Sequence, residues 1–366
     1  MAYTTIDDPS QYFDTTIWTG SGGARTITGL NHKPDLIWTK TRSVAYNHML
    51  SDSSRGFNAN SEIGSNSEAA EGGLSADVYG YKSGHTSDGW TMVDGTDSVD
   101  SQEDGNTNQP SVTYVGWTWA ANGGTTSSFT ESGNNPGGTI QTNTDAGFSI
   151  ITTTGTGGAG TISHGLGAVP HWIISKCRSH DNTGWGVYHK QNTSAPETEL
   201  LGLAGNGATL DSSSYYNDTA PTSSVFTVGT SNDINGDART YVFYAWTEIQ
   251  GFSKFGSYTG NGNADGPFVY TGFKPAWVMI KNTSASANWH MYDNKRDATN
   301  VVETAFKANN SGAEFTTSNK LDFVSNGFKN RAGDQVSTNT SGSTYIYMAF
   351  AEHPFVSSKG VPTTAR

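Results

Sequence analysis

The sequence predicts an all-β protein made of three tandem antiparallel β-sandwich modules, of a jelly-roll or lectin-like kind. Glycine supplies 44 of the 366 residues and favours turns, while aromatic residues supply 11% and favour strands. A group of sequence landmarks also recurs three times along the chain, which predicts three copies of one structural unit. Good helix formers are scarce, so we expect almost no helix.

The first landmark is a short apolar run between a proline and a lysine, at residues 34–40, 170–176 and 275–281. Proline suits the first residue of a strand, where its missing N–H costs no ladder hydrogen bond. Because side chains alternate along a strand, Trp38, Trp172 and Trp277 share a face with the lysine of their own run. Each run therefore predicts a strand.

The second landmark follows 80, 71 and 70 residues after these prolines, at residues 114–120, 241–247 and 345–351. Each copy opens with tyrosine and is apolar on both faces, as expected of the central strand of a two-layer sandwich. We therefore expect Trp119, Trp246 and Phe350 to be equivalent core positions. The first copy is about ten residues longer, and we place the extra residues near 94–105.

A third landmark opens each copy with an aromatic residue and ends at a Thr-Gly turn. It begins at residues 12–13, 147–148 and 254–255. Between the landmarks, residues 185–188 match residues 289–292, and residues 46–49, which begin at Tyr46, are the expected counterpart in the first copy.

These landmarks predict three domains: residues 1–125 with an N-terminal segment, residues 126–251 with a linker, and residues 252–366. Residues 121–145 have the polar composition of a linker, whereas only residues 250–253 separate the last two copies. We therefore expect the second and third modules to be held together more tightly than the first and second.

Charge and cysteine content exclude several classes of protein. The net charge is −12, without the clustered Lys and Arg that a nucleic-acid surface needs. No apolar run approaches 18 residues, so no membrane insertion is expected. Cys177 is the single cysteine, which excludes an intramolecular disulfide, and the first residues lack the basic and apolar regions of a signal peptide.

An acidic stretch in the first copy is the main candidate for a metal site. Asp94, Asp97, Asp100, Glu103 and Asp104 offer the oxygen ligands that calcium prefers, without the spacing of an EF-hand. We expect a solvated loop instead. Residues 233–237 resemble a calcium loop but are too short, and a hairpin turn between the flanking strands explains them better.

No catalytic, cofactor-binding or metal-binding residue is predicted. The nine histidines have no HExxH spacing, and residues 85–88 (His-Thr-Ser-Asp) are expected to form a turn. Glu248 and Glu352 occupy matching positions, but a strand-end charge is the simpler interpretation of each than a glycosidase pair. The sequence therefore predicts a protein that is not an enzyme.

Two sets of residues have both a structural and a binding interpretation. Lys40, Lys176 and Lys281 could each pair with a buried carboxylate, although we expect them to extend from a strand end to water. Most aromatic residues recur at strand positions and are expected in the core. Unrepeated loop aromatics are the candidates for stacking on sugar rings, namely Tyr79, Tyr81, Tyr215 and Tyr216.

The landmarks resemble a repeated module of structural and tail-fibre-like proteins of marine bacteriophages. The resemblance rests on the pattern YTG–G–P–WV–IK, on the W-MYD element at residues 289–293 and on the closing run at residues 345–352, and it covers nearly the whole chain. The opening residues 1–13 are also similar to the start of such proteins. The resemblance implies a virion component, assembled in the cytoplasm of the bacterial host, and it implies no catalytic residues.

We therefore expect a virion structural protein on the particle surface that resembles a tail fibre and contacts the host. The alternatives are a head fibre or capsid decoration protein, and a carbohydrate-binding or polysaccharide-degrading protein. Expected partners are other virion proteins, further copies in a homotrimer and a host-surface glycan. Residues 1–12 are the expected anchor to the particle, and the loops at residues 61–84 and 94–108 are the expected host-contacting surface.

Overall fold

The computed structural model describes residues 2–97 and 104–362. Strands hold 41% of the residues and helices 5%, which confirms the all-β prediction. No helix among the described residues is long and apolar enough to cross a membrane.

The strands fall into three groups along the chain. The first group comprises β1 (Phe13–Thr19), β2 (Arg25–Ile27), β3 (Leu36–Thr41), β4 (Met49–Asp52), β5 (Tyr81–Thr86), β6 (Gly89–Val93) and β7 (Thr113–Trp119), with the one-turn helices η1 (Pro9–Gln11), η2 (Ala59–Ser61) and α1 (Ala76–Tyr79). The second comprises β8 (Ser127–Phe129), β9 (Gly138–Asn143), β10 (Phe148–Thr154), β11 (Gly160–Ser163), β12 (Trp172–Cys177), β13 (Trp185–His189), β14 (Glu199–Gly202), β15 (Leu210–Asp211), β16 (Val225–Val228) and β17 (Thr240–Trp246), with η3 (Pro196–Thr198) and α2 (Ser213–Tyr216). The third comprises β18 (Ser253–Thr259), β19 (Phe268–Tyr270), β20 (Phe273–Asn282), β21 (His290–Asp293), β22 (Val302–Lys307), β23 (Phe315–Val324), β24 (Gly327–Asn330) and β25 (Thr344–Pro354).

One antiparallel strand order occurs in all three groups, which we call the first, second and third repeats. It runs β1-β7-β3-β4, then β10-β17-β12-β13, then β18-β25-β20-β21. In each repeat the second landmark forms the strand between the first and third landmarks. Its last aromatic residue pairs with an equivalent position of the next strand, Trp119 with Leu36, Trp246 with Trp172 and Phe350 with Trp277. The predicted equivalence of these positions is confirmed.

A smaller group of strands covers the outer face of each main sheet. It is a separate sheet in the first repeat (β2-β6-β5) and in the second (β11-β16), whereas in the third it is β24-β19, the end of the same eight-stranded sheet. Each pair of layers encloses an apolar cluster of its own, to which the outward-facing residues of the central strand contribute, for example Tyr114, Phe243 and Ala349.

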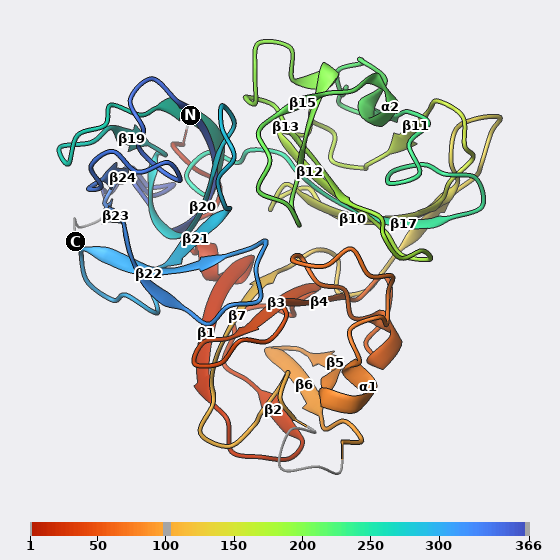
Figure 1. The fold of residues 1–366 in the computed structure, drawn as a ribbon, viewed down its shortest axis with the longest axis horizontal. Helices are drawn as coiled ribbons and strands as arrows, with labels where there is room; N and C mark the ends of the chain where they lie inside the picture. Colours follow the sequence, from red (N-terminus) through yellow and green to blue (C-terminus); the bar gives the residue numbers. More distant parts are fainter. Residues whose placement is uncertain (1, 98–103, 363–366) are drawn as a thin grey trace.

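The inner faces of the three main sheets meet in one shared apolar core. Figure 1 shows the three repeats grouped around a common centre, with β1 and β7 of the first repeat directed toward β10 and β17 of the second and β20 of the third. At this centre the ring centroid of Trp119 lies 6.2 Å from that of Trp246 and 5.6 Å from that of Phe350. One apolar core therefore joins residues of all three repeats.

The predicted linker is folded into the second repeat. Residues 127–129 and 138–143 form β8 and β9, and β9 extends the main sheet by pairing with β10. Gln141 lies on β9, and its side-chain oxygen accepts hydrogen bonds from the backbone N–H groups of Asn122 (3.0 Å) and Gly124 (2.7 Å). Polar composition did not reveal this, because threonine is common in loops and is also a favoured strand residue.

Two of the predicted matches between copies are shifted by two residues. The register pairs Trp119 with Phe13, Trp246 with Phe148 and Phe350 with Ser253, so the third landmark of the last copy begins at Ser253 and not at 254–255.

The counterpart of Trp185 in the first repeat is likewise His48 and not Tyr46. Trp185 lies opposite Lys176 in the β12–β13 pair, and the β3–β4 pair, which joins Thr39 to Met49, continues to His48 opposite Lys40. Matching ring with ring gave the wrong register in both places, because backbone pairing and not ring type decides which residues are equivalent.

Residues 233–237 do not form the predicted hairpin turn. They lie between β16 and β17, which belong to different sheets. The predicted turn at residues 85–88 is confirmed, since Thr86 pairs with Gly89 in the hairpin of β5 and β6.

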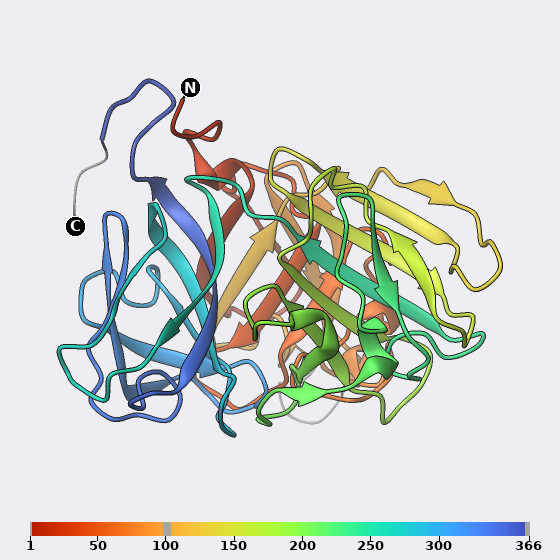
Figure 2. The same cartoon turned by 90° about the horizontal axis from the view of Figure 1, so that it is seen from above.

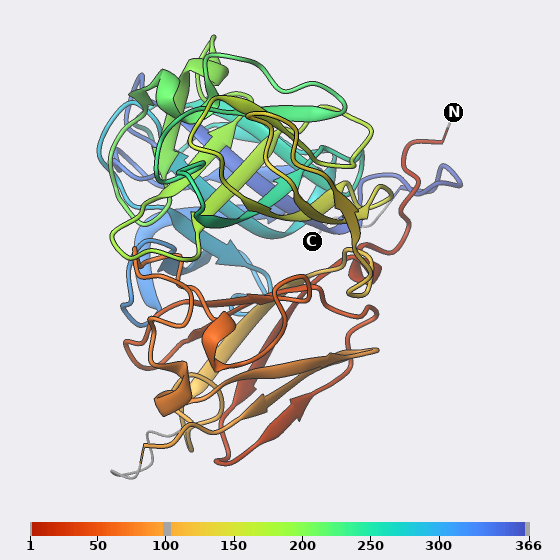
Figure 3. The ribbon, with the colours of Figure 1, turned by 90° about the vertical axis from the view of Figure 1, so that its right-hand side faces the viewer.

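The N-terminal segment is packed against the body of the protein and is not a free appendage. Ile6 is 4% exposed within the shared core, and the hydroxyl of Thr4 donates a 2.8 Å hydrogen bond to the carbonyl of Gln250. Asp7 accepts hydrogen bonds from the backbone and hydroxyl of Ser358. Figures 2 and 3 show the described segments before Pro9 and after Pro354 projecting on the same side of the molecule.

Candidate binding cleft

A cleft of about 350 Å³ lies in the seam between the first and third repeats. Two tyrosine rings and two asparagine side chains contribute to its walls. The residues that line it are Ala45, Tyr46, Asn47, Gly73, Leu74, Ser75, Tyr79, Asn106 and Ser311. All but Ser311 come from the first repeat.

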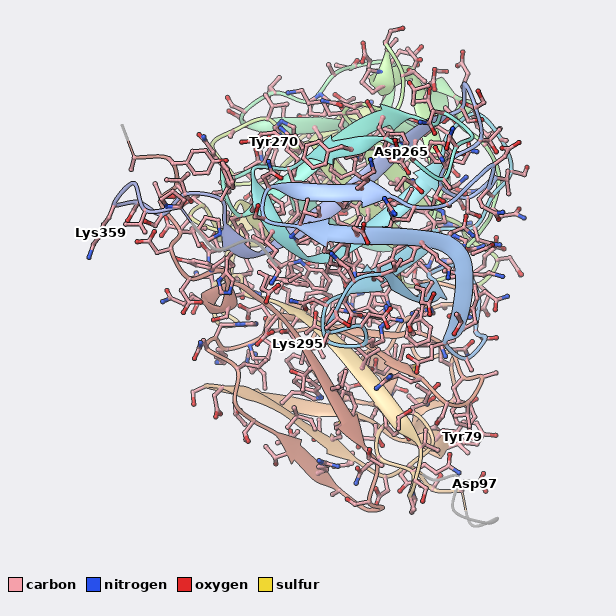
Figure 4. The ribbon with its side chains drawn as sticks, turned by 90° about the vertical axis from the view of Figure 1, so that its left-hand side faces the viewer. Tyr79, Asp97, Asp265, Tyr270, Lys295 and Lys359 are labelled. Atoms are coloured by element: carbon pink, nitrogen blue, oxygen red, sulfur yellow. The ribbon has the colours of Figure 1, made fainter. Side chains whose placement is uncertain are left out.

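The two longer loops of the first repeat meet at this cleft. Backbone hydrogen bonds join them: Thr96 N–H donates to the carbonyl of Asp77 (2.9 Å), and Asn106 N–H donates to the carbonyl of Tyr79 (2.9 Å). Helix α1 ends at Tyr79, and Gly80 follows with φ of 89°, a conformation that favours glycine. Figure 4 shows Tyr79 at the surface close to Asp97. The loops expected to make specific contacts are thus brought together around one cavity.

Tyr46 lines the cleft from the segment between β3 and β4. Burial raises the pKa of its hydroxyl, and the nearby Tyr79 and Asp104 raise it further, so the hydroxyl stays protonated at neutral pH. It donates a long 3.4 Å hydrogen bond to the side-chain oxygen of Gln109. Asn47 accepts a 2.8 Å hydrogen bond from the amide of Asn66 and so has a fixed orientation. Aromatic faces beside oriented amides can hold a polar ligand with apolar surfaces, such as a sugar.

The acidic stretch beside the cleft does not form a described calcium site. Asp100 and Glu103 lie outside the described residues. Asp104 is buried, and its carboxylate accepts a hydrogen bond from the N–H of Gly23 (3.2 Å). Within residues 2–97 and 104–362, no three His, Cys, Asp or Glu side chains are grouped so that they could hold a metal ion. Asp104 is therefore engaged in fixing the backbone of its own repeat.

Each of the two matched glutamates is paired with a lysine of the third repeat. Glu248 forms an ion pair with Lys254, and Glu352 forms one with Lys274 at 2.8 Å. Burial raises the pKa of Glu352, but hydrogen bonds from Lys274 and Asn294 outweigh it and bring the pKa below its ordinary value. A general acid needs the opposite shift.

The repeated lysines are buried and do not reach water, so the expected extension from a strand end is wrong. Their ammonium groups are held mainly by backbone carbonyls: Lys40 by Thr41 at 2.9 Å, Lys176 by Thr183 at 2.9 Å, and Lys281 by the carbonyl of the adjacent Asn282 at 2.5 Å. Burial lowers the pKa of Lys40 to about 7 and the pKa values of Lys176 and Lys281 to about 8.

The four candidate loop aromatics have different environments. Tyr79 lines the cleft, and Tyr81 is partly buried against the small cluster that contains Leu74. Tyr216 is buried in the core of the second repeat, where it packs edge-on against Tyr188. Tyr215 packs against the same cluster, and its hydroxyl donates to Asp233. The core prediction failed to include Tyr215 and Tyr216 because no other copy has aromatic residues there.

A repeated asparagine escaped the sequence comparison. Asn108, Asn235 and Asn339 are buried, and each accepts a hydrogen bond at its backbone carbonyl from a glycine N–H in the turn after the opening strand. Their side chains bond the same turns, in the second repeat through Thr156 and Gly158. Each asparagine lies six residues before the tyrosine that opens the second landmark, a spacing that could have identified it. In the second repeat these bonds occupy the backbone N–H groups of Thr156 and Gly157, which are then not available to bind a phosphate.

Ring N–H groups join each repeat to the next in cyclic order. The indole of Trp185 donates to the carbonyl of Gly64 (2.9 Å), and that of Trp289 donates to the carbonyl of Gly202 (3.0 Å). His48 lies 3.1 Å from the carbonyl of Lys307 through its Nε2. The three equivalent positions therefore link the second repeat to the first, the third to the second, and the first to the third.

Comparison with known proteins places the chain in a family defined by sequence. No curated protein and no solved structure matched it. A family model described as a domain of unknown function, DUF7483, matches residues 8–354, which include all three repeats. The chain therefore belongs to the DUF7483 family.

Proposed function

We propose that this protein is a non-enzymatic structural component of a bacteriophage particle, exposed on the particle surface and contacting the host through the cleft of the first repeat. The observation that carries the proposal is the origin of the cleft. Tyr79 comes from the loop at residues 61–84, where the sequence predicts residues that the other repeats lack, while the frame beneath it is common to all three. Loops that differ in length and sequence on a shared sheet framework are typical of sites of specific recognition.

We further propose that each main sheet and its outer strands form one β-sandwich module, which gives three tandem modules at residues 1–125, 126–251 and 252–366. The separate apolar cluster between the layers of each repeat supports this division. In a homotrimer, three copies are expected to meet around a common axis. Here the three repeats of a single chain already meet around a common centre. Any further association of copies then uses outer surfaces.

The proposal that the protein is not an enzyme is supported by the state of two buried histidines. Burial lowers the pKa of His189 to about 3 and that of His290 to about 4, so both are neutral at neutral pH. His189 lies 3.2 Å from the carbonyl of Tyr347 in the neighbouring repeat. Groups that fix the contacts between repeats are not free for acid–base chemistry.

The proposed location is the virion, with assembly in the cytoplasm of the bacterial host and with other virion proteins as partners. Neither nucleic acid nor membrane insertion has a part in the proposal. The proposed anchor is the end where Asp7 and Ser358 are hydrogen-bonded, which adds the C-terminal segment to the expected N-terminal one.

Antibody labelling of intact particles tests this function. Antibodies raised against the purified protein are applied to purified particles of the phage that encodes it, and bound gold is located by electron microscopy. We expect labelling at one defined position on intact particles. Labelling of host cell debris but not of particles would show that the protein is not a surface component.

A variant of the cleft tests the proposed contact. Tyr79→Ala should reduce binding of fluorescent protein to host cells at least about tenfold, since the ring is a main wall of the cleft. Leu210→Ala, which changes an exposed side chain of the second repeat, is the control and should bind normally. Equal binding by both variants would exclude the cleft as the host contact.

A further inference from the structure

Strand β19 presents two aromatic side chains to solvent. Phe268 is 49% exposed and Tyr270 is 51% exposed, whereas Val269 between them is 6% exposed and belongs to the core of the third repeat. Because side chains alternate along a strand, the two rings lie on the same outward face, about 7 Å apart along the strand. β19 ends the order of its sheet, so it pairs with β24 alone.

The equivalent strands of the other repeats show that the fold does not need these rings. Val269 pairs with Phe328, as Ile27 pairs with Trp90 and Ile162 with Phe226, which aligns β19 with β2 and β11.

In that alignment, small hydroxyl residues stand where β19 has its rings. The outward neighbours of Ile27 are Thr26 and Thr28, and those of Ile162 are Thr161 and Ser163. The equivalent strands form with small hydroxyl residues at these positions. Exposing two large rings to water therefore does not help the strand to form. The aromatic pair is therefore a specific feature of the third repeat.

Tyr270 is held in place although half of it is exposed. Its hydroxyl lies 3.0 Å from the hydroxyl of Tyr3, and Tyr3 in turn donates a 2.8 Å hydrogen bond to the carbonyl of Gly272. The ring of Tyr3 also packs edge-on against Phe355. A ring fixed before binding loses little conformational entropy when a ligand covers it, which favours affinity.

Polar groups flank the two rings. Lys329 lies opposite Phe268 in the β19–β24 register, and its ammonium pairs with Asp265 at 2.5 Å. The side chain of Asp265 is 81% exposed, so its carboxylate can accept further hydrogen bonds. Figure 4 shows Asp265 and Tyr270 on the same side of the third repeat. Hydroxyl donors and acceptors of a ligand thus have partners beside the rings.

We propose that this face of β19 binds a neutral polysaccharide, whose pyranose rings stack on Phe268 and Tyr270 while Asp265 and Lys329 bond its hydroxyl groups. Sugar rings combine an apolar C–H face with a polar edge, which is the combination that this surface offers. The neighbouring charges are one anion and one cation, so they do not favour a charged glycan. The face is separate from the cleft of the first repeat.

A protein partner fits this surface less well. A stable protein interface covers about 800 Å² on each partner and about 20–30 residues, with an apolar centre. Here Lys329 and Asp265 border Phe268 and the hydroxyl of Tyr3 borders Tyr270, so charged or hydrogen-bonding groups lie beside both rings. A single extended glycan chain needs only a narrow surface of this kind.

Affinity electrophoresis with neutral polysaccharides tests the proposal without requiring a host. The full-length protein is run through native gels that contain laminarin, soluble agarose or galactomannan. We expect at least one of them to retard the wild-type protein. The variant Phe268→Thr/Tyr270→Ser carries the residue types of the sibling strands and should fold normally, with retardation weakened at least about tenfold. Leu210→Ala, which changes an exposed side chain of the second repeat, is the control and should be retarded like the wild type.

Three outcomes would overturn the proposal: no retardation of the wild type by any of the three polysaccharides, equal retardation of the double variant, or a self-association in light scattering that the double variant abolishes. The last would assign the face to a second copy of the chain. Particle labelling is independent of these results, so the proposed function and this inference can fail separately.

Discussion

The hydroxyl of Tyr244 donates a 2.7 Å hydrogen bond to the carboxylate of Asp52, although 192 residues separate the two in the chain. Asp52 also pairs with Arg55, and both side chains are fully buried. Arg55 in turn binds Glu71 at 2.6 Å, and Glu71 binds Arg178 of the second repeat at 2.7 Å. A buried polar network therefore crosses the seam between the first and second repeats.

Removing the hydroxyl of Tyr244 tests the strength of this network. Tyr244→Phe leaves a buried carboxylate with one hydrogen bond fewer, which should lower the free energy of unfolding by about 1–3 kcal/mol. Tyr270→Phe is the matched control, since its hydroxyl is near the surface, and should change the value by less than about 0.5 kcal/mol. Urea unfolding followed by tryptophan fluorescence measures both. Equal effects would show that the hydroxyl of Tyr244 contributes no more to stability than a hydroxyl near the surface does.

The third repeat places an equivalent ion pair against the first. Asp293 pairs with Arg296 at 2.6 Å and also accepts a 3.2 Å hydrogen bond from the indole of Trp117. Arg296→Met should lower the free energy of unfolding by about 3–5 kcal/mol, because it leaves a buried carboxylate without its partner.

The second repeat supplies a control for that substitution. It has His189 and Asn192 at the positions equivalent to Asp293 and Arg296. The double variant Asp293→His/Arg296→Asn removes both charges together and should be less destabilised than Arg296→Met in the same urea unfolding assay. A double variant that is less stable than Arg296→Met would contradict the charge argument.

The buried lysines predict a rise of stability with pH. An unfolded lysine keeps its proton up to about pH 10.5, whereas folded Lys40 loses it near pH 7 and Lys176 and Lys281 lose theirs near pH 8. Between these values the unfolded chain binds more protons, so the free energy of unfolding rises with pH, by up to about 1.4 kcal/mol per pH unit for each lysine. Above about pH 10, ionisation of tyrosines in the unfolded chain opposes the rise.

Urea unfolding at a series of pH values from 7 to 9.5 measures this slope. Lys40→Met should reduce the slope, because it removes one of the buried lysines that release a proton on folding. Lys359→Met changes an exposed lysine and should leave the slope unchanged. A wild-type stability that falls steadily over this range would contradict the assigned burial.

The sequence allowed the repeat, its main strands and the shared tryptophan face to be predicted, because alternation along a strand depends on local pattern alone. It did not reveal where that face points. Trp38 and Trp172 face the other repeats and not the layer above their own sheet, and only the assembled chain determines this. The two errors of register at Tyr46 and Phe255 arose where ring type was compared without strand pairing.

The candidate cleft was predictable only in part. The two long loops of the first repeat were expected to make contacts, but their meeting around Tyr46 and Tyr79 depends on backbone bonds between segments about 20 residues apart or more. The outward pair Phe268 and Tyr270 was not expected, since β19 is too short to stand out in the sequence. Alignment of the three outer strands, which needs the pairing register, makes the pair visible.

Three repeats fold around one core, and differential scanning calorimetry tests this arrangement most directly. Trp119, Trp246 and Phe350 meet at the centre, so opening any repeat exposes the core of the other two. We predict a single transition with equal calorimetric and van't Hoff enthalpies. Trp246→Ala, which removes a ring stacked 4.4 Å from Trp172, should lower the stability by about 3–5 kcal/mol and shift that whole transition. Two or three separate transitions, of which Trp246→Ala shifts only one, would contradict the claim.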